Sequence, residues 1–369
     1  MKNKSLVYLF FISIGALSIL DMVNEEKVFS ELENRYLKRK PKLTTESVLS
    51  GKYAKSYEEY INDNFIYRDS FINLKSISES MQLKLENNNI IYGKDGYMFE
   101  KFTDFDKEIL ENNIGAVKDF IEKSSLNIDL MLVPYSASVL TDYYPMNLSS
   151  VLVNEEMLID KVNDYIGQKN IVDVKKTLME NKKSYIYYKT DHHWTSYGAY
   201  LSYLEFCKKN NITDVVELEN LKENKVNDFL GTFYSKAKLF NAQEDTLSYY
   251  DMPHLQMKIG DGNWESIYKL ENLEKRDKYS VFLDGNHSKI VVKNSKNKNR
   301  KKLLVLKDSF ANSFIPFIAN NYEEVHVIDL RHYSLKLSDY IKENSFDKVL
   351  ALYSFKDFVE DRTIARIKF

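Results

Sequence analysis

The sequence predicts an α/β fold whose central, mostly parallel sheet is covered by helices. Between residues 105 and 210, and again between residues 302 and 353, short apolar runs alternate with longer segments of helical periodicity. Such alternation is typical of parallel strands joined by helices. Two polar segments, residues 190–195 and 307–310, each stand between an apolar run and a helical one. Ligands of open α/β sheets bind beyond the carboxyl ends of the strands, so we expect chemistry in these two segments.

Composition limits the class of protein. The chain has 369 residues, of which 44% are hydrophobic, enough for one large domain or two smaller ones with a buried core. Its 52 Lys and Arg residues nearly balance 54 Asp and Glu residues, which argues against a nucleic-acid partner, because such partners select strongly basic surfaces. The single cysteine, Cys207, excludes an internal disulfide and a multi-thiolate zinc site. Its apolar helical surroundings predict a buried structural thiol.

The N-terminus has the pattern of a membrane anchor. Lys2 and Lys4 precede an apolar run over residues 6–20, and the acidic Asp21 follows. A spanning helix needs about 20 apolar residues, so this run is slightly short, but no small-residue cleavage site follows it. We therefore expect residues 1–24 to form an uncleaved signal anchor in the cell membrane. The basic residues predict that the N-terminus lies inside and the rest of the chain is extracellular. The alternative is secretion after signal cleavage.

The rest of the chain divides into two regions. Residues 25–88 are charged and periodic, and they predict a helical spacer or packing region with amphipathic helices over 56–65 and 70–85. Residues 89–369 carry the strand and helix alternation and are expected to form the α/β domain. Within it, residues from about 215 to 300 lose the rhythm and predict an inserted region of mixed strands and loops.

The α/β domain begins with a β-hairpin signal, because apolar residues 90–92 and 97–99 flank a Gly-Lys-Asp-Gly turn. The strands predicted after it cover residues 127–134, 171–174, 185–188, 302–307, 325–329 and 349–353. The predicted helices cover residues 105–123, 155–168, 194–210, 309–320 and 335–343. Pro316 is expected to bend or break the fourth of these helices. No GxGxxG or GxxxxGK[ST] pattern occurs between a strand and a helix, which weakens dinucleotide and P-loop interpretations.

Ser309 is a candidate nucleophile. It stands in Lys307-Asp308-Ser309-Phe310, after a predicted strand and at the start of a predicted helix. A hydroxyl at such a junction is exposed at the carboxyl end of the sheet, and the N–H groups of the helix can stabilise a developing oxyanion. The alternative is that Asp308 or Ser309 merely caps the helix.

Asp191 and His193 supply the groups that a serine nucleophile needs. Histidine is the usual base for a serine, and a carboxylate fixes its tautomer. Residues two apart in an extended segment point the same way, so Asp191 and His193 can share a face while His192 points elsewhere. The local pattern therefore favours His193 as the base and Asp191 as its partner, with His192 and Trp194 in packing roles.

A metal site is the competing interpretation of this segment. Asp191, His192 and His193 are good ligands. The histidines that could complete a set are His254, His287, His326 and His332. Adjacent histidines rarely bind one ion, and no HExxH-type spacing is present, so we expect neither a metal nor a cofactor. A third interpretation is that these histidines are structural.

Two further segments offer polar groups to the same edge. Gly285 and Asn286 present a backbone N–H and a side-chain amide, both suitable oxyanion donors, although the pair is also an ordinary turn dipeptide. Arg331 follows the strand predicted at 325–329 and is a substrate-binding candidate for a carboxylate. A surface salt bridge is equally consistent with its sequence context.

Taken in order, these motifs resemble the DHHW family of bacterial proteins, which is named after the tetrapeptide at residues 191–194. The chain is similar, more distantly, to alginate O-acetylation proteins with an SGNH-hydrolase-like domain. In that group an Asp-x-His motif precedes the serine, a permuted order relative to ordinary SGNH hydrolases, and the same order occurs here. The segments that carry the resemblance are residues 33–35, 92–97, 190–195, 285–286, 307–310 and 329–333.

The resemblance implies an SGNH-hydrolase-like three-layer sandwich in permuted order. It implies that Ser309 is the nucleophile, His193 the base and Asp191 its orienting carboxylate, with Gly285 and Asn286 as oxyanion donors. One departure stands out: SGNH serines usually follow Gly-Asp, whereas Lys307 occupies the glycine position here. A lysine does not allow the close backbone approach that glycine allows.

The function that the resemblance implies is serine-dependent O-acyl transfer, with O-acetylation as the specific reaction, on a cell-surface or exported polysaccharide. Its expected partners are the polysaccharide or glycan substrate, the membrane through the anchor, and an acyl-donor protein of an envelope assembly. A carbohydrate esterase with the same triad is the close alternative, because water then replaces the acceptor sugar. A non-catalytic polysaccharide-binding component of an envelope assembly is the alternative from another class. Hydrogen-bond contact between Ser309 and His193 favours catalysis over binding alone.

Overall fold

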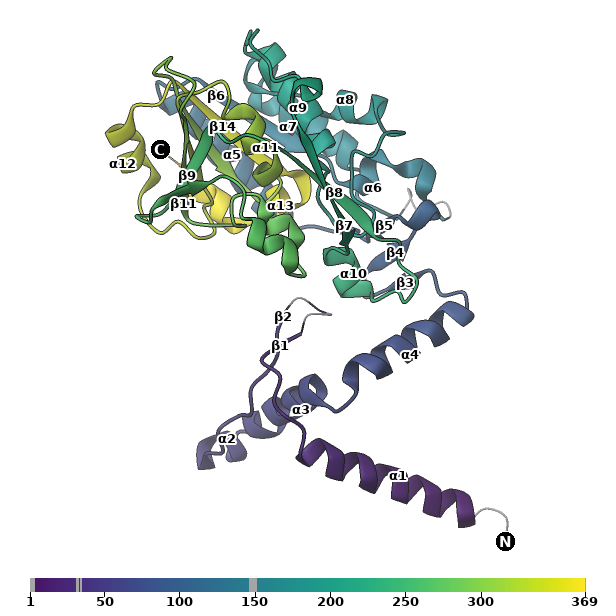
Figure 1. The fold of residues 1–369 in the computed structure, drawn as a ribbon. Helices are drawn as coiled ribbons and strands as arrows, with labels where there is room; N and C mark the ends of the chain where they lie inside the picture. The colour runs from purple at the N-terminus through teal and green to yellow at the C-terminus, as the bar shows by residue number, and fades with distance from the viewer. Residues whose placement is uncertain (1–3, 31–32, 34, 146–150, 369) are drawn as a thin grey trace. The chain divides into compact units, whose positions relative to one another are not determined.

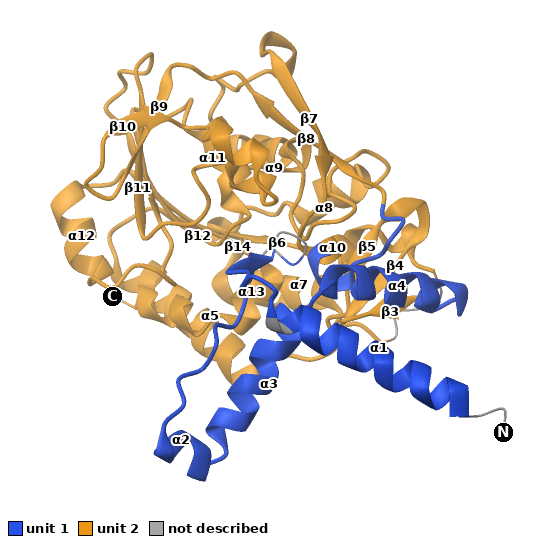
Figure 2. Ribbon diagram, turned by 60° about the horizontal axis from the view of Figure 1, so that its bottom comes forward, with its two compact units in different colours: residues 1–84, 235–242 blue, residues 85–234, 243–369 orange. Residues whose placement is uncertain are grey.

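The computed structural model describes residues 4–30, 33, 35–145 and 151–368 (Figure 1). The chain divides into two compact units (Figure 2). The first comprises residues 1–84 and 235–242, and the second comprises residues 85–234 and 243–369. All the residues that the sequence singles out for chemistry belong to the second unit.

The first unit opens with the apolar helix α1 (Lys4–Met22). Its stretch Lys4–Asp21 is long and apolar enough to cross a membrane, and none of that stretch is buried. The N-terminal apolar helix expected from the sequence is therefore present, and it is compatible with a signal anchor or with a signal peptide.

The remainder of the first unit is small and mainly helical. It contains a two-stranded antiparallel ribbon, β1 (Phe29–Ser30) and β2 (Arg35–Tyr36), and the helices α2 (Thr45–Leu49), α3 (Lys52–Asn64) and α4 (Arg68–Met81). The amphipathic helices predicted at residues 56–65 and 70–85 correspond to α3 and α4. Thr44 begins α2 as its N-cap, because its side chain accepts a hydrogen bond from the Ser47 N–H.

Ion pairs around two partly or fully buried carboxylates hold the elements of this unit together. Glu33 accepts a hydrogen bond from Arg68 at 2.8 Å and pairs with Lys238 at 2.9 Å. Asp63, in the last turn of α3, accepts two hydrogen bonds from the Arg35 guanidinium at 2.6 and 2.9 Å. Burial alone would raise the pKa of Glu33, but Arg68 and Lys238 lower it overall, so the carboxylate stays ionised and paired.

A seven-stranded sheet is the centre of the second unit. From one edge to the other its strands are β10 (Trp264–Ser266), β9 (Leu255–Ile259), β11 (Lys289–Asn294), β13 (Glu324–Ile328), β12 (Lys302–Lys307), β14 (Lys348–Ser354) and β6 (Ile128–Val133). The strands predicted at 127–134, 302–307, 325–329 and 349–353 are all present, and they form the parallel half of the sheet.

The sheet is mixed rather than mostly parallel. Its other three pairings, β10 with β9, β9 with β11 and β11 with β13, are antiparallel. These strands come from the region expected at 215–300 to be an insertion of mixed strands and loops. They join the sheet because buried residues alternate along them, Leu255 with Met257 and Ile290 with Val292, and continue its apolar face.

The helices of the second unit are α5 (Lys107–Lys123), α6 (Ser136–Val139), α7 (Glu155–Ile166), α8 (Lys175–Glu180), α9 (Ser196–Lys209), α11 (Ala311–Ile318), α12 (Leu337–Asn344) and α13 (Phe355–Glu360). A further helix, α10 (Thr232–Ala237), has residues in both units. Residues of α5, α7, α12 and α13 share one core with Leu304 and Leu306 of β12. Helices α9 and α11 pack on each other through aromatic rings, among them Phe206 and Phe314.

Pro316 lies within α11 and does not break it. All eight residues of α11 are buried. Tertiary packing therefore holds this short helix, and the loss of one backbone hydrogen bond at the proline is tolerated.

Smaller sheets complete the second unit. The predicted hairpin is present as β4 (Ile90–Tyr92) and β5 (Met98–Glu100), joined by β3 (Glu86–Asn87) into three antiparallel strands. Strands β7 (Glu223–Phe229) and β8 (Asp245–Tyr250) form a separate antiparallel ribbon.

Two predicted strands, 171–174 and 185–188, are absent from the sheet. The first makes a single parallel bridge, Ile171 with Leu130. The second makes a single antiparallel bridge, Tyr187 with Trp194, which folds the chain back on itself. Residues 186–188 are buried although they are not part of the sheet. Hydrophobicity alone does not distinguish such a buried segment from a strand of the sheet. Residues 188–193 thus form a closed loop, which carries the Asp-His-His motif.

Candidate active site

The loop of residues 188–193 is fixed at its base by a second buried carboxylate. Asp245, at the start of β8, accepts hydrogen bonds from the N–H groups of Lys189 and Thr190 at 2.7 and 2.8 Å. It also accepts a hydrogen bond from the Thr190 hydroxyl at 2.5 Å. Because the bridge between Tyr187 and Trp194 closes the other side, the loop presents its tip in one conformation.

The structure brings Asp191, His193 and Ser309 together. His193 Nε2 lies 2.8 Å from Ser309 Oγ, and His193 Nδ1 lies 2.6 Å from Asp191 Oδ1. The exposed fractions of the three residues are 2%, 5% and 9%, so the contacts are shielded from water. The Asp191 carboxylate can only accept at Nδ1, which fixes the proton there and leaves Nε2 free to accept the serine proton.

Thr232 and Gly231 orient Asp191. The Thr232 N–H and hydroxyl donate to Asp191 Oδ2 at 2.7 and 3.1 Å. Burial alone would raise the pKa of Asp191, but His192, His193 and these hydrogen bonds lower it well below its usual range, so it is ionised. Gly231 lies so close that a Cβ there would stand 2.2 Å from the Asp191 Cβ. Local sequence gives no sign of this contact, because Thr232 is 41 residues from Asp191.

Tyr279 is a second residue that sequence reasoning missed. Its ring stacks on the His193 imidazole, with centroids 3.7 Å apart and planes 10° apart. Its hydroxyl donates to the Ser309 carbonyl at 3.1 Å, so one side chain contacts both members of the pair. Trp194 has a packing role, as expected, and its indole N–H donates to the Phe310 carbonyl at 2.9 Å.

His192 makes no contact with Ser309 but lies against the other two residues: its ring centroid is 3.7 Å from that of His193, and its Nδ1 is 3.6 Å from Asp191 Oδ1. Its Nδ1 contacts the Thr232 hydroxyl at 2.6 Å, and since that hydroxyl gives its proton to Asp191, His192 is the donor. Burial, and then the neighbouring His193, lower the pKa of His192 to about 4, so the ring is neutral at physiological pH.

The metal alternative rests on three adjacent residues. Asp191, His192 and His193 can each place one ligand atom within 4.8 Å of the others. Among the described residues, no other histidine, cysteine or carboxylate joins this group. Both His193 nitrogens already contact Ser309 and Asp191, so an ion would have to displace those contacts. The donor set therefore fits a proton-transfer site better than a metal centre.

Ser309 lies at the carboxyl end of β12, two residues after the strand ends. Asp308 holds the turn, since its two carboxylate oxygens accept from the N–H groups of Phe310 at 2.9 Å and Ser354 at 2.6 Å. The Ser309 hydroxyl is therefore not needed as a cap and contacts His193 instead. Within the part of the chain that the structure describes, the Ser309 N–H has no hydrogen-bond acceptor. That leaves it available to an oxyanion.

The two predicted oxyanion donors, Gly285 and Asn286, differ in whether they are free to donate to an oxyanion. The Gly285 N–H donates to the Phe282 carbonyl at 3.1 Å, within a turn where Gly285 has φ of 82°. The Asn286 side chain is exposed, and its Oδ1 accepts from Lys307 Nζ at 2.5 Å. Asn286 therefore remains the candidate donor of the pair.

Arg331, the predicted substrate-binding residue, makes a two-point pair with Asp329. Its Nε and Nη2 donate to the two carboxylate oxygens at 2.9 and 2.7 Å. It also approaches Asp357 at 3.4 Å. The guanidinium is held in place by these acids, and a role in binding substrate stays a prediction.

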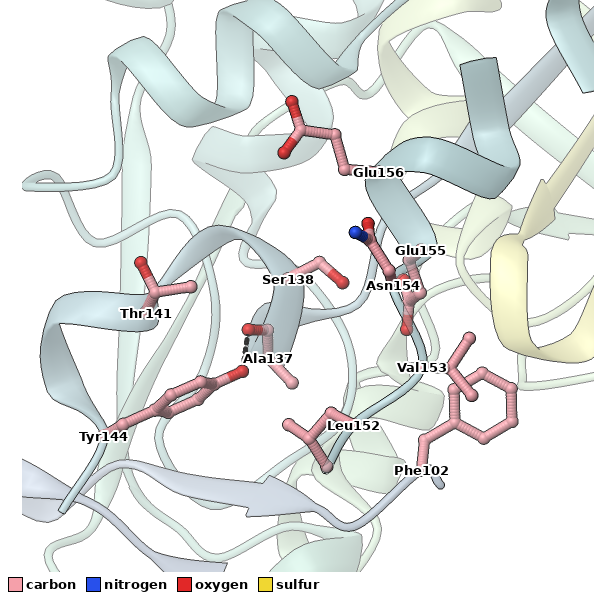
Figure 3. A pocket seen from close by; sticks show the side chains of 10 residues that line it. All are labelled: Phe102, Ala137, Ser138, Thr141, Tyr144, Leu152, Val153, Asn154, Glu155 and Glu156. Atoms are coloured by element: carbon pink, nitrogen blue, oxygen red, sulfur yellow. Dashed lines mark hydrogen bonds between the residues drawn. The ribbon is translucent and has the colours of Figure 1, made fainter. Parts of the chain in front are cut away.

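A cavity of about 190 Å³ lies beside the turn from β6 to α6. Figure 3 shows Ser138 of α6 and Glu155 of α7 among the side chains that line it. Tyr135 connects this region to the site, because its N–H donates to Glu155 at 2.9 Å while its ring lies 5.7 Å from that of Phe310. Burial raises the pKa of Glu155 to about 7.

The fold and this geometry define an α/β protein with a buried Ser–His–Asp arrangement at the carboxyl edge of its parallel strands. A family model described as "DHHW protein" matches residues 146–328. The match confirms the resemblance to the DHHW family predicted from residues 191–194. None of the curated proteins matches this chain in sequence.

Solved structures support the same fold. A DHHW family protein from Eubacterium siraeum is 25% identical, with a TM-score of 0.66 over 76% of this chain and 95% of that chain. Bacillus cereus PatB1 is 22% identical, with a TM-score of 0.60 over 74% of this chain and 98% of that chain, and it has also been solved with a sulfonyl adduct. The O-acetyltransferase domain of Pseudomonas putida AlgJ is a more distant match, 12% identical with a TM-score of 0.46 over 76% of this chain and 98% of that chain. This last likeness is too low to support an argument.

Proposed function

We propose that the chain is an extracytoplasmic, serine-dependent O-acyltransferase, and specifically an O-acetyltransferase, that modifies a cell-surface or exported polysaccharide. One observation carries the proposal: His193 Nε2 lies 2.8 Å from Ser309 Oγ while His193 Nδ1 lies 2.6 Å from Asp191. These are the contacts that activate a serine hydroxyl and stabilise the imidazolium that forms.

The first half-reaction transfers the acyl group to the protein. His193 Nε2 takes the Ser309 proton as Oγ attacks the carbonyl carbon of the acyl donor. The tetrahedral oxyanion is stabilised by the Ser309 N–H and the Asn286 amide. It collapses to a serine ester, and the leaving group takes the proton from His193.

The second half-reaction moves the acyl group to the acceptor. His193, again neutral, removes the proton of a sugar hydroxyl, whose oxygen attacks the ester carbonyl. The second oxyanion collapses, the acylated sugar leaves, and Ser309 Oγ recovers its proton from His193. When water takes the place of the sugar the same steps give ester hydrolysis, so the carbohydrate-esterase alternative differs only in the acceptor.

The proposal includes the setting of the site. We assign residues 1–24 to a signal anchor, residues 25–88 to a helical spacer, and residues 89–369 to an SGNH-hydrolase-like domain in permuted order. Lys2 and Lys4 before the apolar run of residues 6–20, and the acidic residues after it, support an extracellular domain. An acyl-donor protein of an envelope assembly would then supply the acyl group.

The test compares the wild type with Ser309→Ala and His193→Ala on a chromogenic acetyl ester. We expect each variant to lose about a thousandfold or more of the rate, because the two residues act as one unit. Equal rates in all three proteins would refute the triad and favour the non-catalytic binding alternative. Adding a polysaccharide acceptor and measuring ester-linked acetate on it distinguishes transfer from hydrolysis.

Covalent labelling gives an independent check. A sulfonyl fluoride should sulfonylate Ser309 in the wild type, and peptide mass spectrometry should place the adduct on that residue. The Ser309→Ala variant is the matched control and should stay unlabelled. An adduct on another residue in both proteins would count against Ser309 as the nucleophile.

A further inference from the structure

Lys307 is the residue that departs most from the expected pattern. It is the last residue of β12, two before Ser309, and its side chain is fully buried. A buried ammonium is costly unless its donors are used. Lys307 Nζ donates to Asn286 Oδ1 at 2.5 Å and to Asn312 Oδ1 at 2.7 Å, and it lies 3.8 Å from Asp329.

These contacts fix which way both amides face. An ammonium can only donate, so the oxygens of Asn286 and Asn312 must face Lys307. The Asn312 Nδ2 then points the other way and donates to the Gly285 carbonyl at 3.2 Å and to Asn286 Oδ1 at 3.3 Å. The Asn286 oxygen therefore accepts twice, and its nitrogen is left as a donor.

The anchors of Asn286 flank the serine. Lys307 precedes Ser309 by two residues, and Asn312 follows it by three, in the first turn of α11. Asn312 is itself tied to the serine, because its N–H donates to the Ser309 carbonyl at 3.1 Å. Among the described residues the exposed Asn286 Nδ2 has no hydrogen-bond acceptor of its own. The Asn286 amide is thus held by two residues that flank the nucleophile, and its nitrogen is left unpaired. An unpaired donor of this kind suits an anion that forms only during reaction.

We infer that Lys307 is a positioning residue, whose ammonium holds the Asn286 amide so that its Nδ2 donates to the oxyanion formed at Ser309. The inference rests on the proposed function and adds a positioning residue to its oxyanion site. Where a glycine would admit the oxyanion by close backbone approach, a buried lysine here sets a side-chain donor instead.

The charges around Lys307 keep it protonated near neutral pH. Burial lowers the pKa of Lys307 to about 8, while Asp329 and Asp308 raise it and Arg331 lowers it. A neutral amine can accept as well as donate, so above that pH the amide orientation loses its constraint.

The test is a double-mutant cycle on the chromogenic acetyl ester with Lys307→Met, Asn286→Ala and the double variant. We expect Asn286→Ala to lower kcat about a hundredfold, the cost of losing one oxyanion donor, with KM within about twofold. Lys307→Met should lower kcat about tenfold or more. The double variant should be no slower than Asn286→Ala, because Lys307 acts through that amide. If the losses of the two single variants multiply in the double variant, the inference is overturned. An unchanged kcat in Asn286→Ala would overturn it as well.

Two further variants test whether a loss of kcat comes from misfolding or altered packing. Asn286→Asp keeps an acceptor for Lys307 but lacks the donor, so it should fold and match Asn286→Ala in kcat; a wild-type kcat in Asn286→Asp would also overturn the inference. Lys348→Met is the matched control, since Lys348 is a buried lysine of β14 that pairs with Asp129 at 2.7 Å. Its kcat should change by less than about twofold. A comparable loss there would assign the Lys307 effect to packing.

The outcomes also separate this inference from the proposed function. If Ser309→Ala loses activity while Lys307→Met and Asn286→Ala keep it, only the inference fails. If Ser309→Ala keeps full activity, the proposed function fails.

Discussion

The Tyr279 ring lies almost parallel to the His193 imidazole, with 3.7 Å between their centroids, while the Tyr279 hydroxyl binds the Ser309 carbonyl. One side chain thus restrains both the ring orientation of the proposed base and the backbone of the proposed nucleophile. Proton transfer across the 2.8 Å contact between His193 and Ser309 depends steeply on geometry. We therefore expect Tyr279 to support catalysis by holding these two residues in position.

Removing the Tyr279 ring should therefore cost activity more than removing its hydroxyl. We expect Tyr279→Leu to lower kcat/KM about tenfold or more and Tyr279→Phe to lower it less, because the phenyl ring still stacks on His193. Esterase kinetics on both variants check the order. Tyr353→Phe is the matched control, because the buried Tyr353 hydroxyl has no hydrogen-bond partner among the residues that the structure describes, and its effect should stay within about twofold. Equal losses in the Leu and Phe variants would contradict a role for the ring.

Asp191→Asn should nearly abolish activity while leaving the loop in place. The amide nitrogen can donate to His193 Nδ1, which moves the imidazole proton to Nε2 and blocks acceptance of the Ser309 proton. The expected loss in kcat is about 10³- to 10⁴-fold. A rate within tenfold of the wild type would show that Asp191 does not set the tautomer.

The same variant has a signature in pH-dependent stability. The pKa of Asp191 is lowered in the folded state, so its ionised form contributes stability above the unfolded value near 3.8, and that contribution is lost as pH falls. Urea unfolding should show Asp191→Asn less stable than the wild type at pH 7. The gap between the two proteins should narrow only at pH below about 4.

How far the sequence predicts this molecule depends on how local each feature is. The order Asp191, His193, Ser309 follows from two junctions that are visible in short windows, and the parallel strands follow from their apolar runs. The contacts of Thr232 with Asp191 and of Tyr279 with Ser309 join residues 41 and 30 positions apart, so no local pattern contains them.

The features that the sequence predicts wrongly or not at all also depend on contacts between distant parts of the chain. Ile186, Tyr187 and Tyr188 are buried although their segment is not a strand of the sheet, and hydrophobicity alone cannot separate these two environments. The antiparallel strands β9–β11 lie in a region of weak periodicity, and their place in the sheet is decided by pairing with β13. Lys307 appeared only as a departure from a motif, because its two amide partners come together in the folded chain alone.

Gly231 gives a steric prediction. A Cβ at this position would lie 2.2 Å from the Asp191 Cβ, so Gly231→Ala must displace the carboxylate or its loop. We expect destabilisation of about 1–3 kcal/mol and at least a tenfold loss of kcat/KM. Gly115→Ala is the control, because nothing lies within 4 Å of its added Cβ and alanine favours the helix, so it should be neutral or stabilising. Full activity in Gly231→Ala would mean that the added methyl group fits without displacing the Asp191 carboxylate.

Glu155 gives a prediction about stability rather than catalysis. Its carboxylate is 3% exposed beside the cavity in Figure 3, and burial raises its pKa from 4.5 to about 7. The folded state therefore binds a proton more tightly than the unfolded state, so this group's contribution to stability is present below pH 4.5 and lost as pH rises through 7. Glu155→Gln keeps an acceptor for the Tyr135 N–H without the charge. We expect it to be more stable than the wild type at pH 8, by up to about 3 kcal/mol, and the gain should shrink toward pH 5. Urea unfolding of both proteins at the two pH values measures this, and a gain that did not depend on pH would mean that Glu155 titrates normally.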